Sequence, residues 1–440
     1  MKVLFVENRY KTYFWDKLAE GLIAAGVEVH WIVQNHAFIP KNGKVHVIPY
    51  PRVEDLRPVS RESLSTIASK DRSINYFDGN SRHYEFYQGK IESILEDICP
   101  DWILGESTLF HELITIDTAR SRNTPYLHPS SCRIPPGRFS FYLYDTLEIH
   151  GGSNQVVTEE EAEQFLQQWA NRTVKIDYMK KNSRMQAYVA IYKKISSWLV
   201  VLRARLAGET YNTPSFLTKW GLMSRQKKAV ARWEDLAVAR QPKANVQYVM
   251  YPMHMQPECN IDVWGYRYRE QDLLIGDIAS NLPAGWGLLV KPNPKSKYEL
   301  STRLMDFIEA DGRIVPLPHT SVMADVLKMA STVVTVSGTI ALESVLSNYP
   351  CLSLAMPYMR DQDDGIRHLL TLSDLPNKLP EIIAKRSDME GRKDAIGLYK
   401  YQVQSSYRGL ISDPVSDPRC VSEENIGNVM AAMLDIMKWE

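Results

Sequence analysis

Three stretches of the chain run from a short hydrophobic segment straight into residues suited to holding a phosphate. Lysine supplies a cation, hydroxyls and backbone N–H groups donate hydrogen bonds, and glycine lets the backbone approach a ligand closely. Parallel strands end at one edge of a sheet, where open α/β sheets bind their ligands, so we expect one shared site. The stretches are 246–251 leading to His254 and Glu258, 286–290 leading to Lys291, and 332–336 leading to Ser337, Gly338 and Thr339.

Lys291 closes an apolar run, and the two prolines at 292 and 294 fix the path of the chain beyond it. A cation held in this way would offset the charge that develops on a departing nucleoside phosphate. Asn293 and Lys295 lie in the same segment, and we predict that they contact the nucleotide. The alternative for Lys291 is a side chain that extends from a strand end to solvent.

His254 can protonate a leaving phosphate or donate a hydrogen bond to it, and Glu258 can hold that histidine, a ribose or Lys291. A single histidine is more often structural. Its place beside Gln-Pro-Glu in an expected cleft favours a catalytic role for both residues.

The Ser337-Gly338-Thr339 turn is predicted to bind phosphate, whereas the alternative is an ordinary helix N-cap. Glycine in the first turn is poor for a plain helix and good for a ligand. Glu343, one turn further on, is a candidate partner for ribose hydroxyls or a solvated helix residue.

The first half of the chain offers acceptor-side candidates. Glu106 follows the apolar run 102–105 and suits a base for an acceptor hydroxyl, or a nucleophile in a retaining reaction, with Asp145 as the competing carboxylate. Arg133 and Arg138 are candidates for binding a substrate carboxylate, because a guanidinium fork matches a carboxylate with two hydrogen bonds.

These residues require two alternations of strand and helix to position them. The first half is predicted to hold strands at 3–6, 27–33, 102–105 and 125–128 with helices at 12–25, 82–98 and 109–121. The second is predicted to hold strands at 246–251, 286–291, 313–316, 332–336 and 350–354 with helices at 270–281, 299–309, 320–329 and 339–347.

The fold class is therefore α/β, with two Rossmann-like doubly wound domains facing a cleft, as in GT-B glycosyltransferases. No GxGxxG motif is present to mark a dinucleotide site. We expect an N-terminal, acceptor-side domain at 1–240 with a helical insertion at 158–205 packed on it. A nucleotide-sugar domain at 241–421 and a helix at 422–440 that crosses back to the first domain complete the chain.

Composition excludes several classes of protein. Lys+Arg and Asp+Glu both number 52, so no overall charge favours nucleic acid. Five scattered cysteines without a CxxC pair argue against a disulfide framework or a zinc site. The N-terminal apolar run is short, and no run is long enough to span a bilayer, so we expect a cytoplasmic protein that is at most peripheral at the inner face of the membrane.

The chain also resembles the bacterial capsule polysaccharide biosynthesis family, which includes Kdo transferases. The resemblance covers roughly residues 100–355, and Asn293 departs from a histidine common at that place. A more distant similarity links the lysine and serine–threonine motifs to bacterial GT-B sialyltransferases. The motifs are His254-Met-Gln-Pro-Glu258, Lys291-Pro-Asn-Pro294, Ser337-Gly-Thr339 and Ser130-Ser-Cys-Arg-Ile-Pro-Pro-Gly-Arg-Phe-Ser-Phe141.

The resemblance implies transfer of Kdo or a related nonulosonic acid from a CMP donor to a capsule or surface glycan or glycolipid, with possible contact to membrane-bound capsule assembly machinery. We expect no cofactor and no essential metal, because the Asp-x-Asp pattern in 360–364 fits a solvated loop. The alternatives are a UDP- or GDP-sugar transferase, a GT-B-like sugar epimerase, and a non-catalytic capsule assembly scaffold.

Overall fold

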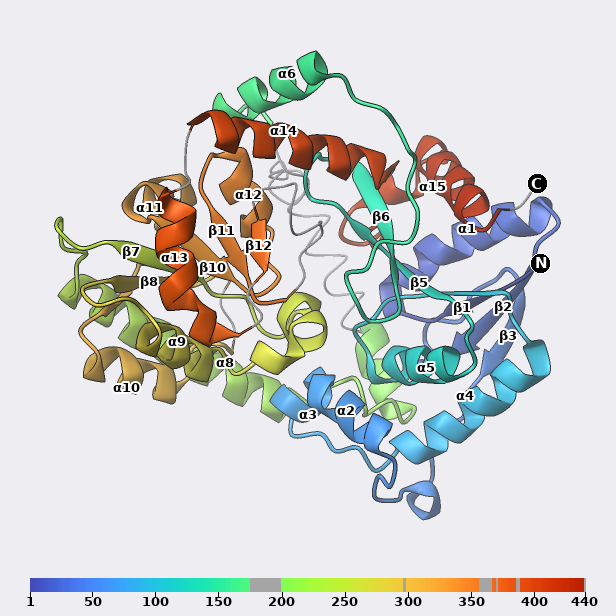
Figure 1. Ribbon diagram of the computed structural model, residues 1–440. Coiled ribbons are helices and arrows are strands. Elements are labelled where there is room, and N and C mark those ends of the chain that lie inside the picture. Colours follow the sequence, from blue (N-terminus) through green and yellow to red (C-terminus); the bar gives the residue numbers. More distant parts are fainter. Residues whose placement is uncertain (175–198, 296–297, 356–365, 369–370, 385–387, 439–440) are drawn as a thin grey trace. The chain divides into compact units, whose positions relative to one another are not determined.

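The computed structural model describes residues 1–174, 199–295, 298–355, 366–368, 371–384 and 388–438 (Figure 1). They form two compact units. Unit 1 contains the described residues of Met1–Val156, Lys175–Ser215 and Val403–Glu440, and unit 2 contains those of Val157–Val174 and Phe216–Gln402. Unit 2 has a parallel sheet and unit 1 a mostly parallel one, each with helices packed on it, which confirms the predicted α/β class with two Rossmann-like domains.

The sheet of unit 1 has the strand order β13-β6-β5-β4-β1-β2-β3. The strands from β5 to β3 in this order run parallel, and β6 and β13 add an antiparallel edge. The strands are β1 (Lys2–Val6), β2 (Glu28–Val33), β3 (Lys44–Val47), β4 (Trp102–Leu104), β5 (Tyr126–Ser131), β6 (Arg138–Leu143) and β13 (Tyr407–Arg408).

Local sequence signals account for the first crossover of unit 1. The helix α1 stops at Ala24, where Gly26 adopts a φ of +85° that favours glycine, and β2 follows at once. The helices are η1 (Arg9–Lys11), α1 (Thr12–Ala24), η2 (Val53–Asp55), α2 (Glu62–Lys70), α3 (Arg72–Tyr76), α4 (Tyr84–Ile98), α5 (Phe110–Ser121), η7 (Pro418–Val421) and α15 (Glu423–Ile436).

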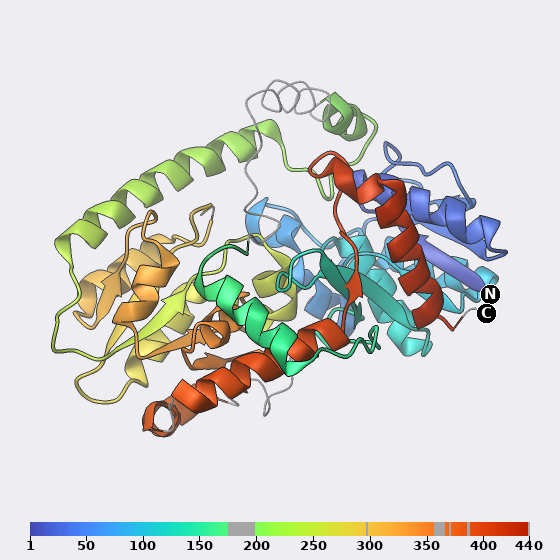
Figure 2. The same ribbon diagram turned by 90° about the horizontal axis from the view of Figure 1, so that it is seen from above.

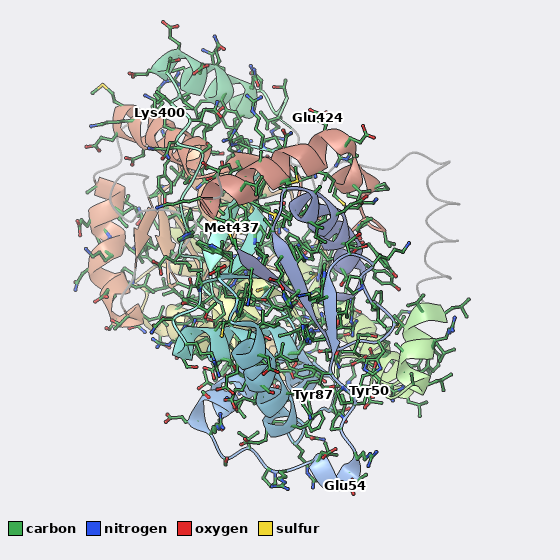
Figure 3. The ribbon with its side chains drawn as sticks, turned by 90° about the vertical axis from the view of Figure 1, so that its right-hand side faces the viewer. Tyr50, Glu54, Tyr87, Lys400, Glu424 and Met437 are labelled. Carbon is green, nitrogen blue, oxygen red and sulfur yellow. The ribbon has the colours of Figure 1, made fainter. Side chains whose placement is uncertain are left out.

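The last helix of the chain completes the core of unit 1. Val429 and Met433 of α15 are fully buried in the same cluster as Phe14 and Leu18 of α1. Figure 3 shows α15 beside α1, with Glu424 near the start of the helix and Met437 just beyond its end. Residues at both ends of the sequence therefore share one hydrophobic core.

The sheet of unit 2 is parallel throughout, with the order β12-β11-β10-β7-β8-β9. The side chains of Val249, Tyr251 and Val290 face a core that includes Trp233 of α8. The strands are β7 (Tyr248–Pro252), β8 (Gly287–Lys291), β9 (Ile314–Pro316), β10 (Thr332–Thr335), β11 (Cys351–Ser353) and β12 (Ile366–His368).

Helices α6 and α14 of unit 2 lie side by side (Figures 1 and 2). Phe165 stacks on Tyr399 across this pair, with 4.2 Å between the ring centroids. The helices of unit 2 are α6 (Glu159–Ala170), α8 (Phe216–Ala239), η4 (Asn260–Trp264, a π-helical turn), η5 (Tyr266–Tyr268), α9 (Gln271–Ser280), α10 (Thr302–Ala310), α11 (Met323–Met329), α12 (Ile340–Leu346), η6 (Leu372–Asp374), α13 (Leu375–Ala384) and α14 (Asp388–Gln404).

The division of the chain differs from the predicted one in three places. The described start of the helical insertion expected at 158–205 is not packed on the first domain, because α6 ends at Ala170, a turn follows, and α6 belongs to unit 2. Residues 175–198 of the expected insertion lie outside the described residues. The long segment of unit 2 begins at Phe216 rather than at 241, because Trp233 of α8 is buried in its core and donates a hydrogen bond to the carbonyl oxygen of Leu317. This segment ends at Gln402 rather than at 421, so the chain returns to unit 1 at Val403 and not at 422. The Asp-x-Asp pattern at 360–364 lies outside the described residues.

Candidate functional site

The three predicted strand ends of unit 2 are neighbours. β7 lies between β10 and β8, so the residues that follow these three strands share one edge of the sheet. The chain passes from β7 to β8 and β9 on one side and then returns to β10 on the other, so the direction of the strand order switches between β7 and β10. Open α/β sheets bind ligands outside the carboxyl ends of strands at such a point.

His254 lies at this switch point, two residues after β7, and is 6% exposed. Its backbone N–H donates to Gln271 Oε1 and its carbonyl accepts from Gln271 Nε2, both at 2.8 Å, so the backbone is fixed. Its Nε2 lies 3.5 Å from the hydroxyl of Thr335, the last residue of β10. Burial lowers the pKa of His254 to about 4, which makes the ring neutral at pH 7.

The turn after β10 closes around this histidine. A Cβ on Gly338 would lie 3.1 Å from Thr335 Oγ1 and 3.2 Å from His254 Cε1, so a larger residue would press on both side chains. Thr339 precedes α12 and makes no capping bond with its side chain. Ser337 is fully buried and its hydroxyl donates to the carbonyl of Asn260, so it anchors η4 and does not offer the phosphate-binding hydroxyl that we predicted.

Lys291, the last residue of β8, is only 3% exposed. Its Nζ donates to the carbonyl of Pro292 at 3.2 Å, and no carboxylate of the described residues lies within 4 Å of it. Burial disfavours the charged form and so lowers the pKa of the Lys291 ammonium. Pro252 of β7 pairs with Lys291, which places the lysine beside the strand that leads to His254.

The remaining predicted residues of unit 2 lie near the same edge in different settings. Glu258 is half-buried where η4 begins, and its backbone N–H donates to Asp262 at 2.9 Å. Asn293 accepts from the backbone N–H of Lys295, whose side chain is exposed. Glu343 is half-buried on α12.

Glu106 occupies the corresponding position in unit 1, where the strand order switches between β1 and β4. It follows β4, and its Oε1 lies 2.5 Å from Nζ of Lys11, which follows β1. Burial raises the pKa of Glu106, and Lys11 opposes that rise. A carboxylate with a raised pKa at the carboxyl edge of a sheet has the properties of a general base.

Asp145, the competing carboxylate, is an ion-paired structural residue. Its two oxygens bind Lys70 at 2.6 Å and Arg120 at 2.5 Å. These two cations overcome the effect of burial and lower the pKa of Asp145 to about 2. Such a carboxylate is a weak base, so Glu106 is the better candidate.

Arg138 does not offer a fork to a substrate, contrary to our prediction. It is 7% exposed, and its guanidinium donates to Ser406 Oγ at 2.7 Å, to the carbonyl oxygens of Ser406 and Val403, and to Gln155 and Ser153. These bonds fasten β6 to the returning chain at 403–406. Arg133 lies half-buried in the turn between β5 and β6, with a φ of +67°.

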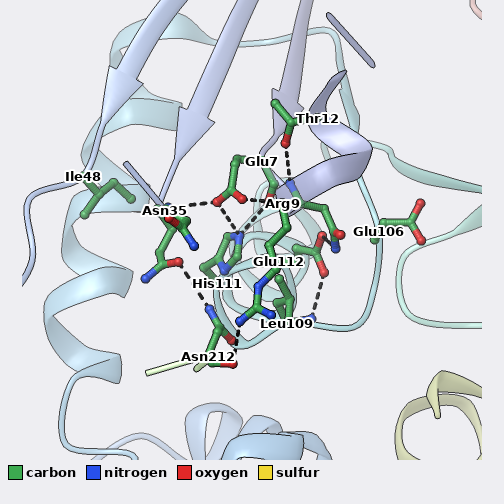
Figure 4. Close-up of polar contacts among 12 residues, drawn as sticks. Glu7, Arg9, Thr12, Asn35, Ile48, Glu106, Leu109, His111, Glu112 and Asn212 are labelled. Carbon is green, nitrogen blue, oxygen red and sulfur yellow. Dashed lines mark hydrogen bonds and ion pairs between the residues drawn. The ribbon is translucent and has the colours of Figure 1, made fainter. Parts of the chain in front are cut away.

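Sequence reasoning missed a buried polar network at the end of β1 (Figure 4). Glu7 is fully buried and accepts from the backbone N–H groups of Arg9 and Asn35. His111 of α5 donates from Nε2 to the carbonyl of Glu7 at 2.7 Å. The run Glu7-Asn-Arg9 directly after an apolar strand was the available signal.

Two further features are absent from the described residues. None of the helices in these ranges is long and apolar enough to cross a bilayer. Among the described residues, no group of three or more His, Cys, Asp or Glu side chains could hold a metal ion.

Comparison with known proteins gives similarity at the level of solved structures. No protein-family model matches the chain, and no curated protein matches it. A UDP-GlcNAc 2-epimerase from Neisseria meningitidis, bound to UDP-GlcNAc, is 13% identical, with a TM-score of 0.25 and 100% of both chains covered. KpsC of Thermosulfurimonas dismutans, a beta Kdo 2,7 transferase, is 8% identical, with a TM-score of 0.34 over 91% of this chain and 99% of that one.

The calicheamicin glycosyltransferase CalG4 is 11% identical, with a TM-score of 0.29 and coverage of 100% of this chain and 98% of that one. Glycosyltransferases and sugar epimerases are thus both among the similar structures. Identities and TM-scores this low assign neither a family nor an activity.

Proposed function

We propose that the protein is a glycosyltransferase that binds a nucleotide-sugar donor at the carboxyl edge of the unit 2 sheet. The observation that carries this proposal is the Lys291 ammonium, which is buried at a strand end with no carboxylate among the described residues close enough to pair with it. Burying an unpaired cation is costly unless an anion binds there. A phosphate is the anion that a sheet edge of this kind receives.

In the proposed reaction the oxygen of an acceptor hydroxyl bonds to the anomeric carbon of the donor. The bond from that carbon to the phosphate oxygen breaks, and its electron pair stays with the phosphate. Lys291 offsets the charge that grows on the phosphate. Neutral His254 supports it by a hydrogen bond, and the proton from the acceptor hydroxyl passes to a general base.

We further propose a CMP-activated donor, with Kdo or a related nonulosonic acid as the sugar and a bacterial capsule or surface glycan or glycolipid as the acceptor. One buried ammonium suits the single phosphate of CMP better than the diphosphate of UDP- or GDP-sugars. The motif resemblance to capsule polysaccharide enzymes supports the same donor. Arg138 no longer supports it, because its donors are occupied.

A thermal shift panel tests this proposal. We expect CMP to raise the Tm more than UDP or GDP does, with and without magnesium. A ligand at 100 times its Kd stabilises the folded protein by about 2.7 kcal/mol, so the difference is measurable. Greater, magnesium-dependent protection by UDP or GDP would leave a transferase with another donor. Turnover of UDP-GlcNAc without an acceptor would indicate an epimerase, and no protection by any nucleotide would remove the donor site.

A further inference from the structure

A pair of arginines in unit 1 has no part in the proposed chemistry at Lys291. Arg9 follows the end of β1, and Arg72 is the first residue of α3. The charge of Arg9 acts on Arg72, both side chains are half-buried, and their sequence neighbours take part in nearby contacts. Asp71 accepts from the Tyr84 hydroxyl, His83 packs on Tyr211 at 4.2 Å, and the neighbouring Asn212 accepts from Arg9.

Arg9 is held in place by only part of its guanidinium. One terminal nitrogen donates to the carbonyl of Asn212 at 2.5 Å (Figure 4). The same nitrogen donates to the Thr213 hydroxyl at 3.1 Å. Its Nε is buried and has no partner in the described part of the chain. The backbone of Arg9 adopts a φ of +43°, a conformation uncommon for a residue with a side chain.

Arg72 is less satisfied than Arg9. Its Nε is buried without a partner, and its guanidinium makes no hydrogen bond or ion pair with any residue described here. Burial, together with the charge of Arg9, lowers the pKa of Arg72 to about 10. Two guanidinium groups that repel each other at a partly dry site form an arrangement that an anion would stabilise.

Four buried acids lie near the pair, and the carboxylate oxygens of each accept hydrogen bonds from groups other than the two arginines. Glu7 accepts backbone N–H groups, Asp71 accepts from Ser73 N and Tyr84, Glu112 accepts from Asn8 and two N–H groups, and Glu209 accepts from Asn212 and Thr213. None of them forms an ion pair with either arginine in the described ranges. They offset the positive charge at longer range without blocking the guanidinium groups.

The surroundings also offer hydrogen-bond acceptors. Asn212 Oδ1 and His111 Nδ1 are buried and lack a partner among the described residues. His111 donates from Nε2 to a carbonyl, so Nδ1 of the neutral ring is an acceptor. Hydroxyl groups attached near an anionic group would find partners here.

We propose that Arg9 and Arg72 form an oxyanion-binding site in unit 1 that takes the carboxylate or phosphate of a hydroxylated molecule such as a sugar acid or a sugar phosphate. The two anions share the same chemistry, because each accepts two parallel hydrogen bonds from a guanidinium. The site stands on residues of unit 1 alone, so the proposal does not depend on nucleotide binding at Lys291.

The test uses the full-length protein with two probes, inorganic phosphate and N-acetylneuraminate, at constant ionic strength. Isothermal titration calorimetry measures affinity, and mass spectrometry measures how fast phenylglyoxal modifies Arg72. We expect saturable binding of at least one probe and slower modification of Arg72 when that probe is bound. Binding of phosphate alone identifies a phosphate ester as the ligand, and binding of N-acetylneuraminate alone identifies a sugar carboxylate.

Variants assign the binding to this pair. Arg72→Gln and Arg9→Gln should each weaken binding about tenfold or more, the effect of losing a hydrogen bond to a charged group. Arg61→Gln removes the same charge from an exposed ion pair with Glu92 and should leave binding unchanged. A Tm of unliganded Arg72→Gln equal to or above that of the wild type would separate a binding role from a structural one.

Three results would overturn the proposal. The first is failure of both probes to bind or to protect Arg72 in the wild-type protein. The second is an equal loss of binding in Arg61→Gln, which would indicate a general effect of charge. The third is loss of binding in Lys291→Met with none in Arg72→Gln, which would place the anion in unit 2.

Discussion

His254 Nε2 lies 3.5 Å from the Thr335 hydroxyl, and the two residues follow and end neighbouring strands at the switch point of the unit 2 sheet. They are 81 positions apart in the sequence. The threonine hydroxyl can orient the imidazole, because it lies within hydrogen-bonding reach of one ring nitrogen. The ring is therefore fixed by its backbone bonds to Gln271 and by contact with a second strand.

Lys291→Met should weaken nucleotide binding and leave the fold intact. The side chains are similar in length, and the methionine removes a buried charge that has no carboxylate partner among the described residues. We expect a loss of about 1.5–3 kcal/mol in binding free energy by calorimetry and an unliganded Tm at or above that of the wild type. Lys295→Met, at an exposed neighbouring position, is the matched control. An unchanged nucleotide affinity in Lys291→Met would contradict the donor site.

His254→Gln should flatten the acid side of the stability profile. The pKa of His254 is about 4 in the folded protein against 6.5 for an ordinary histidine, so the unfolded chain takes up the proton first as the pH falls. Stability from this group is present above pH 6.5 and is lost as the pH falls to 4, by about 3 kcal/mol. Urea unfolding between pH 4 and 7.5 measures it, and Thr335→Val, which keeps the histidine, should keep the slope.

The same His254→Gln variant should lower turnover by about 10²–10⁴-fold with a much smaller change in donor affinity, because its proposed partner is charge that grows in the transition state. Steady-state kinetics with the donor found in the nucleotide panel would measure this. Near-normal turnover would assign His254 a structural role only.

Gly338→Ala should disturb His254 without removing any chemical group. The new Cβ would lie 3.1–3.2 Å from Thr335 Oγ1 and His254 Cε1, which forces one of them to move. We expect a loss of about 1–2 kcal/mol in stability and reduced turnover. Gly427→Ala is the control, because a Cβ in that position of α15 meets nothing within 4 Å and should be neutral or stabilising. Equal behaviour of the two variants would argue against a crowded site.

Glu106→Gln and Asp145→Asn should separate catalysis from stability. Asp145→Asn leaves Lys70 and Arg120 without their anion and should destabilise the fold by about 3 kcal/mol with turnover preserved. Because the folded pKa of Asp145 is about 2, its contribution is present above pH 3.8 and is lost as the pH falls toward 2. Glu106→Gln should lower turnover with a small change in Tm. The opposite pattern would make Asp145 the catalytic carboxylate.

The sequence predicted strands and helices where short apolar runs were bounded by turn residues. The five strands predicted for the second half correspond to β7–β11 within two residues at either end. The same pattern predicted that Lys291 ends a strand and that it lies at the same edge of the sheet as His254. β6 and the two-residue β13 were missed, because an antiparallel edge built from distant segments leaves no local signal.

The roles of individual polar residues depended on partners far along the chain. Arg138 reads as a loop arginine in sequence, yet its partners Val403 and Ser406 are 265 and 268 positions away. Ser337 reads as a phosphate ligand, but its hydroxyl is taken by the carbonyl of Asn260, 77 positions away. Spacing in sequence identifies which residue types follow a strand, whereas tertiary packing decides which donors are already occupied.

The return of the chain to unit 1 has a consequence for its biosynthesis. A ribosome releases residues 216–402 before it releases 403–437, so the parallel sheet of unit 2 is complete while unit 1 still lacks β13 and α15. Until then Phe14 and Leu18 of α1 miss the apolar partners Val429 and Met433. The nascent N-terminal segment therefore exposes a hydrophobic surface during the synthesis of unit 2. We expect a chaperone to bind this surface during that time.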